Sequence, residues 1–265
     1  MMHNIRQIKI INFIAGKQFV SMQELRDLCP DVTLMTLHRD LDALASDGLV
    51  IKVRGGARVQ GLPRVPGAPG ATGASGMSGD PSFQSREFEN IDGKKIIAAK
   101  AAGLIREGGS VFFDAGTTTL AAIRALPDIN LTIITNGANF ANELVRFSNV
   151  TAYMCCGALN RSNMALSGHS TLDFLDGLNI DLGFIGVTGY SGDSGFTCGK
   201  ESEMLVKKLI IQKARKSVVL MDASKLTRLM PYTFAKLADV DYVIGDGAMP
   251  ESFAQEAQSA GVVLL

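Results

Sequence analysis

The strongest constraint on folding near the N-terminus is a row of leucines that recur every three or four residues, namely Leu34, Leu37, Leu41 and Leu44. This spacing places all of them on one face of a helix, which must pack against other apolar side chains. Thr33 precedes the row and can cap the helix, and the Asp47-Gly48 pair supplies a stop. With the leucines turned inward, the outer side of the helix is expected to carry Met35, His38, Arg39 and Asp42.

Two shorter helical patterns precede this segment. The first is a run of isoleucines at intervals of three, which favours an amphipathic helix ending near Gly16: Ile5, Ile8, Ile11 and Ile14. The second begins at Ser21, which together with Glu24 forms a capping-box pattern. The inner face of this second helix is expected to hold Met22, Leu25 and Leu28, and a turn through Pro30-Asp31 follows.

An apolar strand and a basic turn follow the leucine-rich helix. Apolar and other side chains alternate from Leu49 to Arg54, and Arg54-Gly55-Gly56-Ala57-Arg58 then places cations on a turn. Helix, helix, turn, helix and wing in this order predict a winged helix-turn-helix, a domain that binds DNA. The alternative is a small three-helix interaction domain, because the chain has a net charge of zero and its first part is only slightly basic.

The expected DNA contacts lie on the third helix and the wing. Arg39 can reach a phosphate or the edge of a guanine, and Thr36 and His38 can donate to the backbone or to a base. The full set of expected DNA-binding residues is Ser21, Thr33, Thr36, His38, Arg39, Lys52 and Arg54.

Composition and cysteine usage favour a reduced cytoplasm. The chain has 265 residues, of which 46% are hydrophobic and 20% charged, and no apolar run long enough to span a bilayer. The N-terminus lacks a signal-peptide pattern. No cysteine pair has zinc spacing and the three histidines are scattered, so we expect no metal site and no cofactor. Cys155 and Cys156 are expected to be buried strand thiols, with redox sensing as the alternative.

A segment rich in Gly, Pro, Ala and Ser divides the chain at residues 61–81. This composition predicts a flexible linker over residues 60–82, between a DNA-binding domain at 1–59 and a second domain at 83–265. The second domain is expected to contain a helix at 96–105, ended by Gly108-Gly109, and further helices that alternate with apolar strands. The strands are predicted at 111–113, 131–135, 150–155, 182–187, 218–221 and 242–244. Continuous apolar strands alternating with helices predict an α/β domain with a mainly parallel sheet.

Several residues that follow these strands suit a ligand site. Parallel sheets bind ligands at the carboxyl ends of their strands. Gly116-Thr117-Thr118-Thr119 lies between a strand and a helix expected from Leu120, where free amides, a helix dipole and hydroxyls suit a phosphate. A helix start capped by a hydroxyl is the alternative, and no Lys follows as in a Walker loop. The other strand-end candidates are Asn136, Gly157, Gly186 and Lys225.

Both halves of the chain resemble the DeoR family of bacterial transcription regulators. The N-terminal resemblance rests on Thr36-Leu37-His38-Arg39-Asp40-Leu41, Leu44, Gly48-Leu49 and Arg54-Gly55-Gly56-Ala57. His38 stands where the family usually has Arg, and Arg54 where it usually has His, so the operator preference is expected to differ. The C-terminal resemblance rests on Phe83, Arg86, Lys94 to Ala98, Asp114 to Thr119, Thr135-Asn136, Gly157, Gly186 to Gly189, Glu203, Lys207, Asp222, Ser224 and Lys225.

The resemblance implies a ribose-5-phosphate-isomerase-like sensor domain that holds a phosphorylated sugar or related metabolite. Its pocket would be formed by Asp114, Gly116, Thr117, Thr118, Asn136, Glu203 and Lys225. Thr188 replaces a carboxylate that is usual in the family, and Leu226-Thr227 replaces Phe-Gly, so the ligand is expected to differ or the pocket to be weakened.

The favoured function is a ligand-responsive transcription regulator, usually a repressor in this family, with no enzymatic activity. It would bind double-stranded operator DNA as a homo-oligomer, a dimer or a tetramer, because operators with two half-sites need two reading heads. One alternative is a DNA-binding protein whose second domain only oligomerises. The other is a sugar-phosphate isomerase in which Glu203 and Lys225 serve the chemistry.

Overall fold

The computed structural model describes residues 5–15, 17, 19–47, 49–53, 55–59 and 83–265. The chain divides into two compact units, Met1–Glu89 and Asn90–Leu265, and each is described by itself. The linker predicted over residues 60–82 lies outside the described residues, as do Gly16, Gly48 and Arg54. The domain boundaries predicted from the sequence therefore stay predictions.

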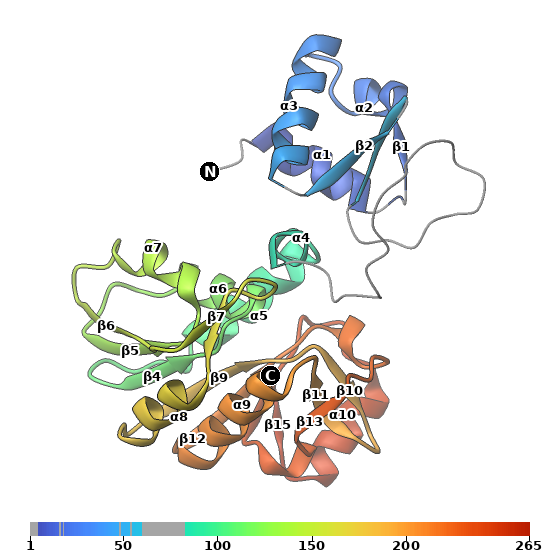
Figure 1. Ribbon diagram of the computed structural model, residues 1–265. Coiled ribbons are helices and arrows are strands. Elements are labelled where there is room, and N and C mark those ends of the chain that lie inside the picture. Colours follow the sequence, from blue (N-terminus) through green and yellow to red (C-terminus); the bar gives the residue numbers. More distant parts are fainter. Residues whose placement is uncertain (1–4, 16, 18, 48, 54, 60–82) are drawn as a thin grey trace. The chain divides into compact units, whose positions relative to one another are not determined.

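The first unit contains the predicted helix-turn-helix followed by a two-stranded wing (Figure 1). Its elements are α1 (Ile5–Ala15), β1 (Val20–Ser21), α2 (Met22–Leu28), α3 (Leu34–Ser46), β2 (Val50–Val53) and β3 (Gly56–Val59). The three strands form a sheet of order β1-β3-β2, in which β3 pairs antiparallel with both neighbours. Gly55 makes the turn of the wing at φ +85°, a conformation that favours glycine. A short helix, α4 (Phe83–Glu87), ends the unit.

Local sequence signals explain where these helices begin. The Ser21 hydroxyl accepts from the Glu24 amide at 3.2 Å, and the Ser21 amide donates to Glu24 Oε2 at 2.9 Å, so the predicted capping box is present. The carboxylate of Glu24 also accepts from Lys17, and these hydrogen bonds lower the pKa of Glu24 to about 2. Thr33 caps α3 by accepting from the Thr36 amide at 3.3 Å.

Two details of the predicted helical faces were wrong. Leu37, Leu41 and Leu44 are fully buried, but Leu34 is 46% exposed because it lies in the first turn of α3, outside the apolar core of the unit. The buried stripe of α1 consists of Ile10, Ile11 and Ile14, while Ile8 lies half-buried at its border. A run with a strict spacing of three drifts around a helix that has 3.6 residues per turn, so the true inner face departs from it.

The second unit is built on a sheet of seven parallel strands, which confirms the predicted fold class (Figure 1). The strand order is β15-β14-β12-β9-β4-β5-β6. These strands span β4 (Ser110–Phe113), β5 (Leu131–Thr135), β6 (Val150–Met154), β9 (Leu182–Gly186), β12 (Lys216–Leu220), β14 (Tyr242–Ile244) and β15 (Val263–Leu264). The helices are α5 (Ile91–Ala102), α6 (Thr117–Arg124), α7 (Ala141–Leu144), α8 (His169–Asp176), α9 (Glu201–Lys213) and α10 (Glu251–Ser259).

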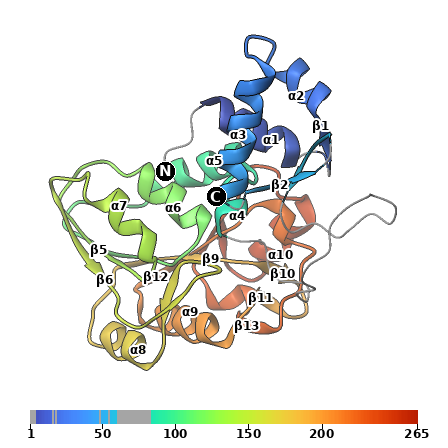
Figure 2. The same ribbon diagram turned by 45° about the horizontal axis from the view of Figure 1, so that its top comes forward.

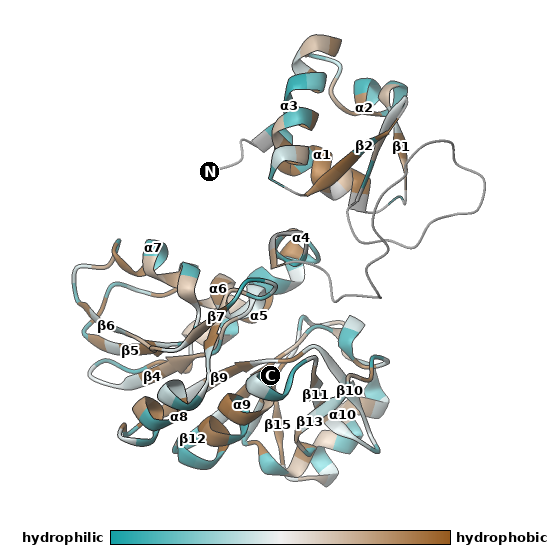
Figure 3. Cartoon of the chain, viewed as in Figure 1, coloured by the Kyte–Doolittle hydropathy of each residue, from teal (hydrophilic) through white to brown (hydrophobic). Residues whose placement is uncertain are grey.

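Helices cover both faces of this sheet, with α5, α6 and α7 on one face and α8 and α9 on the other (Figure 2). Figure 3 shows the central strands β4, β5 and β9 as predominantly apolar. Successive side chains of these strands point to opposite faces of the sheet. Phe112 and Ile134 belong to the core on the face covered by α8 and α9. Gly183 on β9 lets α9 approach closely, because a Cβ there would lie 2.6 Å from Ile210 Cγ2.

The sequence missed the antiparallel strands and misplaced two helix starts. A hairpin is formed by β7 (Ala158–Asn160) and β8 (Ala165–Ser167), and a small sheet by β10 (Gly189–Ser191), β11 (Gly195–Cys198) and β13 (Tyr232–Ala235). α5 begins at Ile91 rather than residue 96, because Asn90 caps it by accepting from the Gly93 amide at 3.3 Å. It is capped by Gly103, before the predicted stop at Gly108-Gly109, and α6 begins at Thr117 rather than Leu120.

Among the helices of the described residues, none combines the length and apolar character that crossing a bilayer requires.

Candidate functional site

The candidate site lies where the winding of the sheet changes direction. From β4 the chain proceeds outward through β5 to β6, whereas β9 lies on the other side of β4 and leads outward to β12, β14 and β15. The carboxyl ends of β4 and β9 thus form a topological switch point, the place where open α/β sheets bind ligands. Asp114 follows β4 and Gly186 ends β9, so these two residues face each other at that point.

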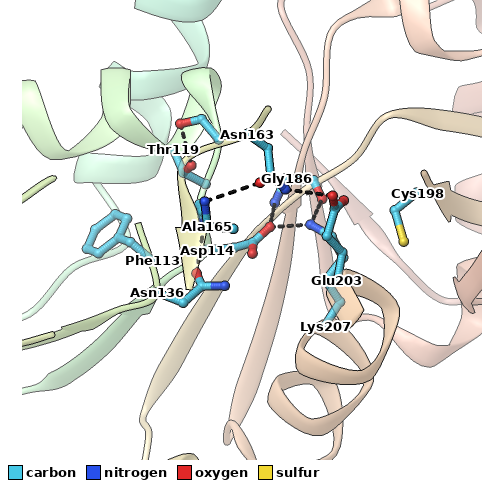
Figure 4. A network of polar contacts seen from close by, with 12 residues as sticks. Phe113, Asp114, Thr119, Asn136, Asn163, Ala165, Gly186, Cys198, Glu203 and Lys207 are labelled. Carbon is cyan, nitrogen blue, oxygen red and sulfur yellow. Dashed lines mark hydrogen bonds and ion pairs between the residues drawn. The ribbon is translucent and has the colours of Figure 1, made fainter. Parts of the chain in front are cut away.

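An ion pair connects the two strands at the switch point. The ammonium of Lys207, on α9, donates to Asp114 Oδ2 and, at 2.8 Å, to the Gly186 carbonyl oxygen (Figure 4). The same carboxylate oxygen accepts from the Gly186 amide at 3.2 Å. The exposed fractions of the Lys207 and Asp114 side chains are only 6% and 4%. Asp114 Oδ1 takes part in none of these hydrogen bonds.

A second carboxylate lies one helical turn before Lys207. Glu203 Oε1 accepts from Asn163 Nδ2 at 2.6 Å, and Asn163 is itself positioned by the Ala165 amide, which donates to Asn163 Oδ1 at 3.2 Å (Figure 4). Lys200, at the N-cap of α9, donates to Asn160 Oδ1 at 2.8 Å and also reaches the same loop at Ser162 Oγ, 3.2 Å away. The hairpin β7–β8 is therefore tied to the first turn of α9.

The N-terminus of α6 supplies hydrogen-bond donors beside Asp114. Gly116 is the N-cap residue and has no side chain with which to cap the helix. The Thr119 hydroxyl donates to the Gly116 carbonyl oxygen at 2.9 Å. Thr117 is buried and Thr118 half-buried. Within the described part of the chain, no hydrogen bond occupies the backbone amides of Thr117 and Thr118. Such a helix start is suited to an anion.

The remaining expected site residues have different local environments. Asn136 Oδ1 accepts from the Ala115 amide at 2.7 Å, so Asn136 fixes the loop that joins β4 to α6. Lys225 Nζ lies 3.7 Å from Asp222 Oδ2, just after β12. Gly157 has φ +130°, and a Cβ there would collide with the Thr171 hydroxyl, so packing alone explains this glycine. The Thr188 backbone amide donates to the Thr197 carbonyl oxygen at 3.2 Å.

The structure thus brings Asp114, Gly116, Thr117, Thr118 and Asn136 together around one loop. Glu203 joins this group through α9, whereas Lys225 and Gly157 lie at the ends of separate strands or just beyond them.

The sequence interpretation missed two members of the constellation. It assigned no role to Lys207, although its spacing of four from Glu203 places both on one helical face. No sequence signal marked Asn163.

The candidate DNA interface lies on α3. His38 and Arg39 are exposed, Met35 is 82% exposed, and the hydroxyls of Thr33 and Thr36 lie 3.0 Å apart. The other two described candidates are engaged locally: the Ser21 hydroxyl donates to Glu24 Oε2 at 2.9 Å, and Lys52 Nζ lies 2.6 Å from Asp42 Oδ1. Arg54 lies outside the described residues.

A buried carboxylate that the sequence did not reveal fixes the orientation of α3. Asp40 is 3% exposed, and its carboxylate accepts from Arg6 Nε at 2.6 Å and from Gln7 Nε2 at 3.1 Å. The hydrogen bond that Arg6 donates to Asp40 raises the pKa of Arg6. Because Asp40 follows Arg39 directly, the ion pair of Asp40 with Arg6 anchors the turn of α3 that carries Arg39.

The adjacent thiols differ from the expectation that both are buried. Cys155 is 3% exposed, and burial raises its pKa to about 12. Cys156 is exposed, and its thiol donates to the Ser170 carbonyl oxygen at 3.3 Å. The two differ because successive side chains at a strand end point to opposite faces, and Cys155 alone faces the core.

Comparisons with known proteins identify both units. Residues 6–61 match the DeoR-like helix-turn-helix domain, and residues 89–247 match the DeoR C terminal sensor domain. The chain is 32% identical over 262 residues to the HTH-type transcriptional regulator GlpR of Haloferax volcanii, covering 98% of this chain and 96% of that protein. It is 31% identical over 260 residues to the HTH-type transcriptional repressor GlcR of Bacillus subtilis, covering 98% and 95%.

Among solved structures, ribose 5-phosphate isomerase A of Methanocaldococcus jannaschii aligns with 52% of this chain and 56% of its own, with 19% identity and a TM-score of 0.39. The two domain matches together with the full-length relatives establish the family. This chain belongs to the DeoR family of transcription regulators.

Proposed function

We propose that this regulator represses transcription and that a phosphorylated sugar or related metabolite, bound by the second unit, changes its affinity for operator DNA. The proposal rests on one observation at the switch point. The backbone amides of Thr117 and Thr118, which no hydrogen bond occupies within the described residues, lie beside the Asp114 carboxylate, which Lys207 holds in place. The repressor sign is supported by the relative GlcR, which is named a repressor. We also propose that it acts in the cytoplasm, where a bacterial regulator meets its operator.

The two ends of a sugar phosphate match the two kinds of group at this site. The amides and hydroxyls of Thr117 and Thr118 suit the phosphate, because they are donors at the positive end of a helix dipole. Asp114 Oδ1 and the Glu203 carboxylate are acceptors for sugar hydroxyls. Lys225, on the other side of the switch point, is a cation for the anionic end.

The DNA-binding face in this proposal is the exposed side of α3. Arg39 contacts a guanine edge or a phosphate, and Thr36 and His38 donate to backbone or bases. The ion pair of Arg6 with the buried Asp40 keeps this face in a fixed orientation. His38 is the residue by which operator choice would differ from that of relatives carrying Arg there.

Effector and operator are linked through a shared conformational equilibrium. A metabolite that favours a form with weak DNA affinity is itself bound less tightly when DNA is present, by the same factor. We further propose that the chain works as a homo-oligomer, a dimer or a tetramer, because two half-sites on DNA require two copies of α3.

Thermal-shift measurements with a panel of sugar phosphates and the matching unphosphorylated sugars test the effector. A ligand present at a hundred times its dissociation constant stabilises the folded state by about 2.7 kcal/mol, which raises the unfolding temperature by several degrees. We expect a shift with at least one phosphorylated compound and none with its sugar. No shift with any phosphorylated metabolite would favour a second unit that serves oligomerisation alone.

We propose that the site performs no isomerisation. Isomerisation requires a carboxylate base free to take a proton from the substrate. Glu203 is already hydrogen-bonded to Asn163, and the family resemblance implies a carboxylate at the position where this chain has Thr188. Turnover of ribose 5-phosphate or glucosamine 6-phosphate by the purified protein would contradict this part of the proposal.

A further inference from the structure

The outermost strand of the seven-stranded sheet, β6, has one uncovered edge. It lies at the end of the strand order and, within the described residues, pairs only with β5 (Figure 1). None of its residues is fully buried, Thr151 and Ala152 are exposed, and Tyr153 is 47% exposed. A strand with such an edge is a template for another strand.

The direction of the backbone groups on β6 follows from its flanking hydrogen bonds. The Leu131 amide donates to the Asn149 carbonyl oxygen at 3.3 Å, and the Cys155 amide donates to the Thr135 carbonyl oxygen at 2.8 Å. Because successive residues of a strand point their backbone groups to opposite sides, the odd-numbered residues face β5. The even-numbered residues therefore direct their N–H and C=O groups away from the sheet: Val150, Ala152 and Met154.

This edge carries none of the features that normally prevent pairing. The segment Val150–Met154 contains no charged residue, no Pro and no Gly, and its register with β5 continues without a bulge. Natural edge strands are usually protected by charged side chains, by Pro, by bulges or by being very short. The opposite edge strand, β15, has only two residues and is protected by its shortness.

We propose that β6 pairs antiparallel with β6 of a second copy of this chain, so that the two sheets join across a twofold axis. This inference rests on the proposed function, which requires two copies on the operator. The pairing is centred on Ala152, which lies opposite Ala152 of the second copy, with Val150 opposite Met154 and Thr151 opposite Tyr153. A second copy fits better than an unrelated strand because this arrangement is self-complementary and places no like charges opposite each other.

The surroundings of β6 are consistent with an interface between copies. Glu143, on α7 beside β6, lies 2.8 Å from Arg124 and 3.2 Å from Arg146, so this carboxylate is paired within one chain. Val145, just after α7, is 81% exposed, and a second copy would remove it and Tyr153 from water. Burial of these side chains favours association.

Cross-linking tests the predicted register. In an antiparallel pair, residues that exchange hydrogen bonds have Cα atoms about 5.5 Å apart, within the range of about 4.4–6.8 Å that a disulfide spans. Ala152→Cys, in a Cys156→Ser background that removes the exposed native thiol, is expected to form a covalent dimer on mild oxidation. Val263→Cys in the same background is the matched control on β15, 47% exposed, and is expected to remain uncrosslinked.

Sedimentation equilibrium of the intact chain tests the energetics. Ala152→Lys places two like charges opposite each other at the axis and is expected to weaken one association step at least tenfold, whereas Val263→Lys leaves association unchanged. If Ala152→Lys keeps the wild-type oligomer and Ala152→Cys forms no cross-link, the β6 pairing is overturned. The proposal that the chain is a homo-oligomer is unaffected by that result. A wild-type chain that is monomeric at micromolar concentration and binds operator DNA as one copy overturns both.

Discussion

Lys207 on α9 pairs with Asp114 after β4, and this buried contact connects the two sides of the switch point. Burial disfavours the charged ammonium, but the attraction of Asp114 outweighs it and raises the pKa of Lys207 above its ordinary value. The stabilisation of the folded state by this ion pair is fully present below the pKa of an unfolded lysine, about 10.4. It is lost as the pH rises through the raised pKa that Lys207 has in the folded state. Lys207 therefore stays protonated at neutral pH.

Removal of one partner from this pair is expected to destabilise the second unit strongly. Lys207→Met leaves the Asp114 carboxylate buried without a cation, which costs about 3–5 kcal/mol. In the double variant Lys207→Met with Asp114→Asn, no uncompensated charge remains, so the loss is expected to be smaller than the sum of the single losses. Urea unfolding of the wild type and the three variants measures this. Strictly additive losses would show that the two side chains do not interact.

The exposed cation on α3 is expected to carry operator binding. Arg39→Ala should abolish specific binding in a gel-shift assay while leaving the unfolding temperature unchanged, because the side chain lies outside the core. Lys95→Ala is the matched control: it removes a cation that is 72% exposed on α5 in the second unit. Wild-type operator affinity in Arg39→Ala would show that this residue does not read DNA.

The hydroxyls at the start of α6 are expected to be necessary for the effector response. Thr117→Ala combined with Thr118→Ala removes two donors from the proposed phosphate position, so DNA binding should persist while induction in a reporter strain is lost. Ser259→Ala, which removes an exposed hydroxyl at the end of α10, is expected to respond like the wild type. Full induction of the double variant would exclude a role for these hydroxyls.

The thiols are expected to react unequally. Thiolate is the reactive form, and burial raises the pKa of Cys155 to about 12 and that of Cys198 to about 11. The folded protein should therefore expose one fast-reacting thiol to a disulfide reagent at pH 8, and the Cys156→Ser variant should have none. Unfolded thiols ionise near pH 8.5, so stability is expected to decline from that pH upward toward the folded values. Rapid modification of two or more thiols in the native protein would contradict the burial of the others.

Local spacing was sufficient to predict the helix-turn-helix and the positions of most parallel strands along the chain. The leucine row, the Ser21–Glu24 capping box and the Thr33 cap act between residues within about one helical turn, so a short window of sequence contains the whole interaction. Strands such as Leu131–Thr135 were predicted with their true bounds because both faces of the sheet are covered and every position is apolar or small.

The antiparallel additions were not predictable in this way. β10, β11 and β13 have only three or four residues each, and so short a stretch has no clear period. The pairing of β11 with β13 also joins residues far apart in the chain, such as Phe196 and Ala235. Long sequence separation also explains why the sequence suggested anion-binding threonines but not their neighbours: Asn163 meets Glu203, which lies 40 positions later in the chain.

By itself, the sequence determined the elements whose stabilising contacts are local, the family, and the residues that follow each strand. Only the tertiary structure decided which of those residues meet. It turned the Asp40 carboxylate inward against Arg6, buried Lys207 against Asp114, and left the edge of β6 uncovered. The physical reason is that a charge is buried only where the fold provides its partner, and an edge exists only once the order of strands is known.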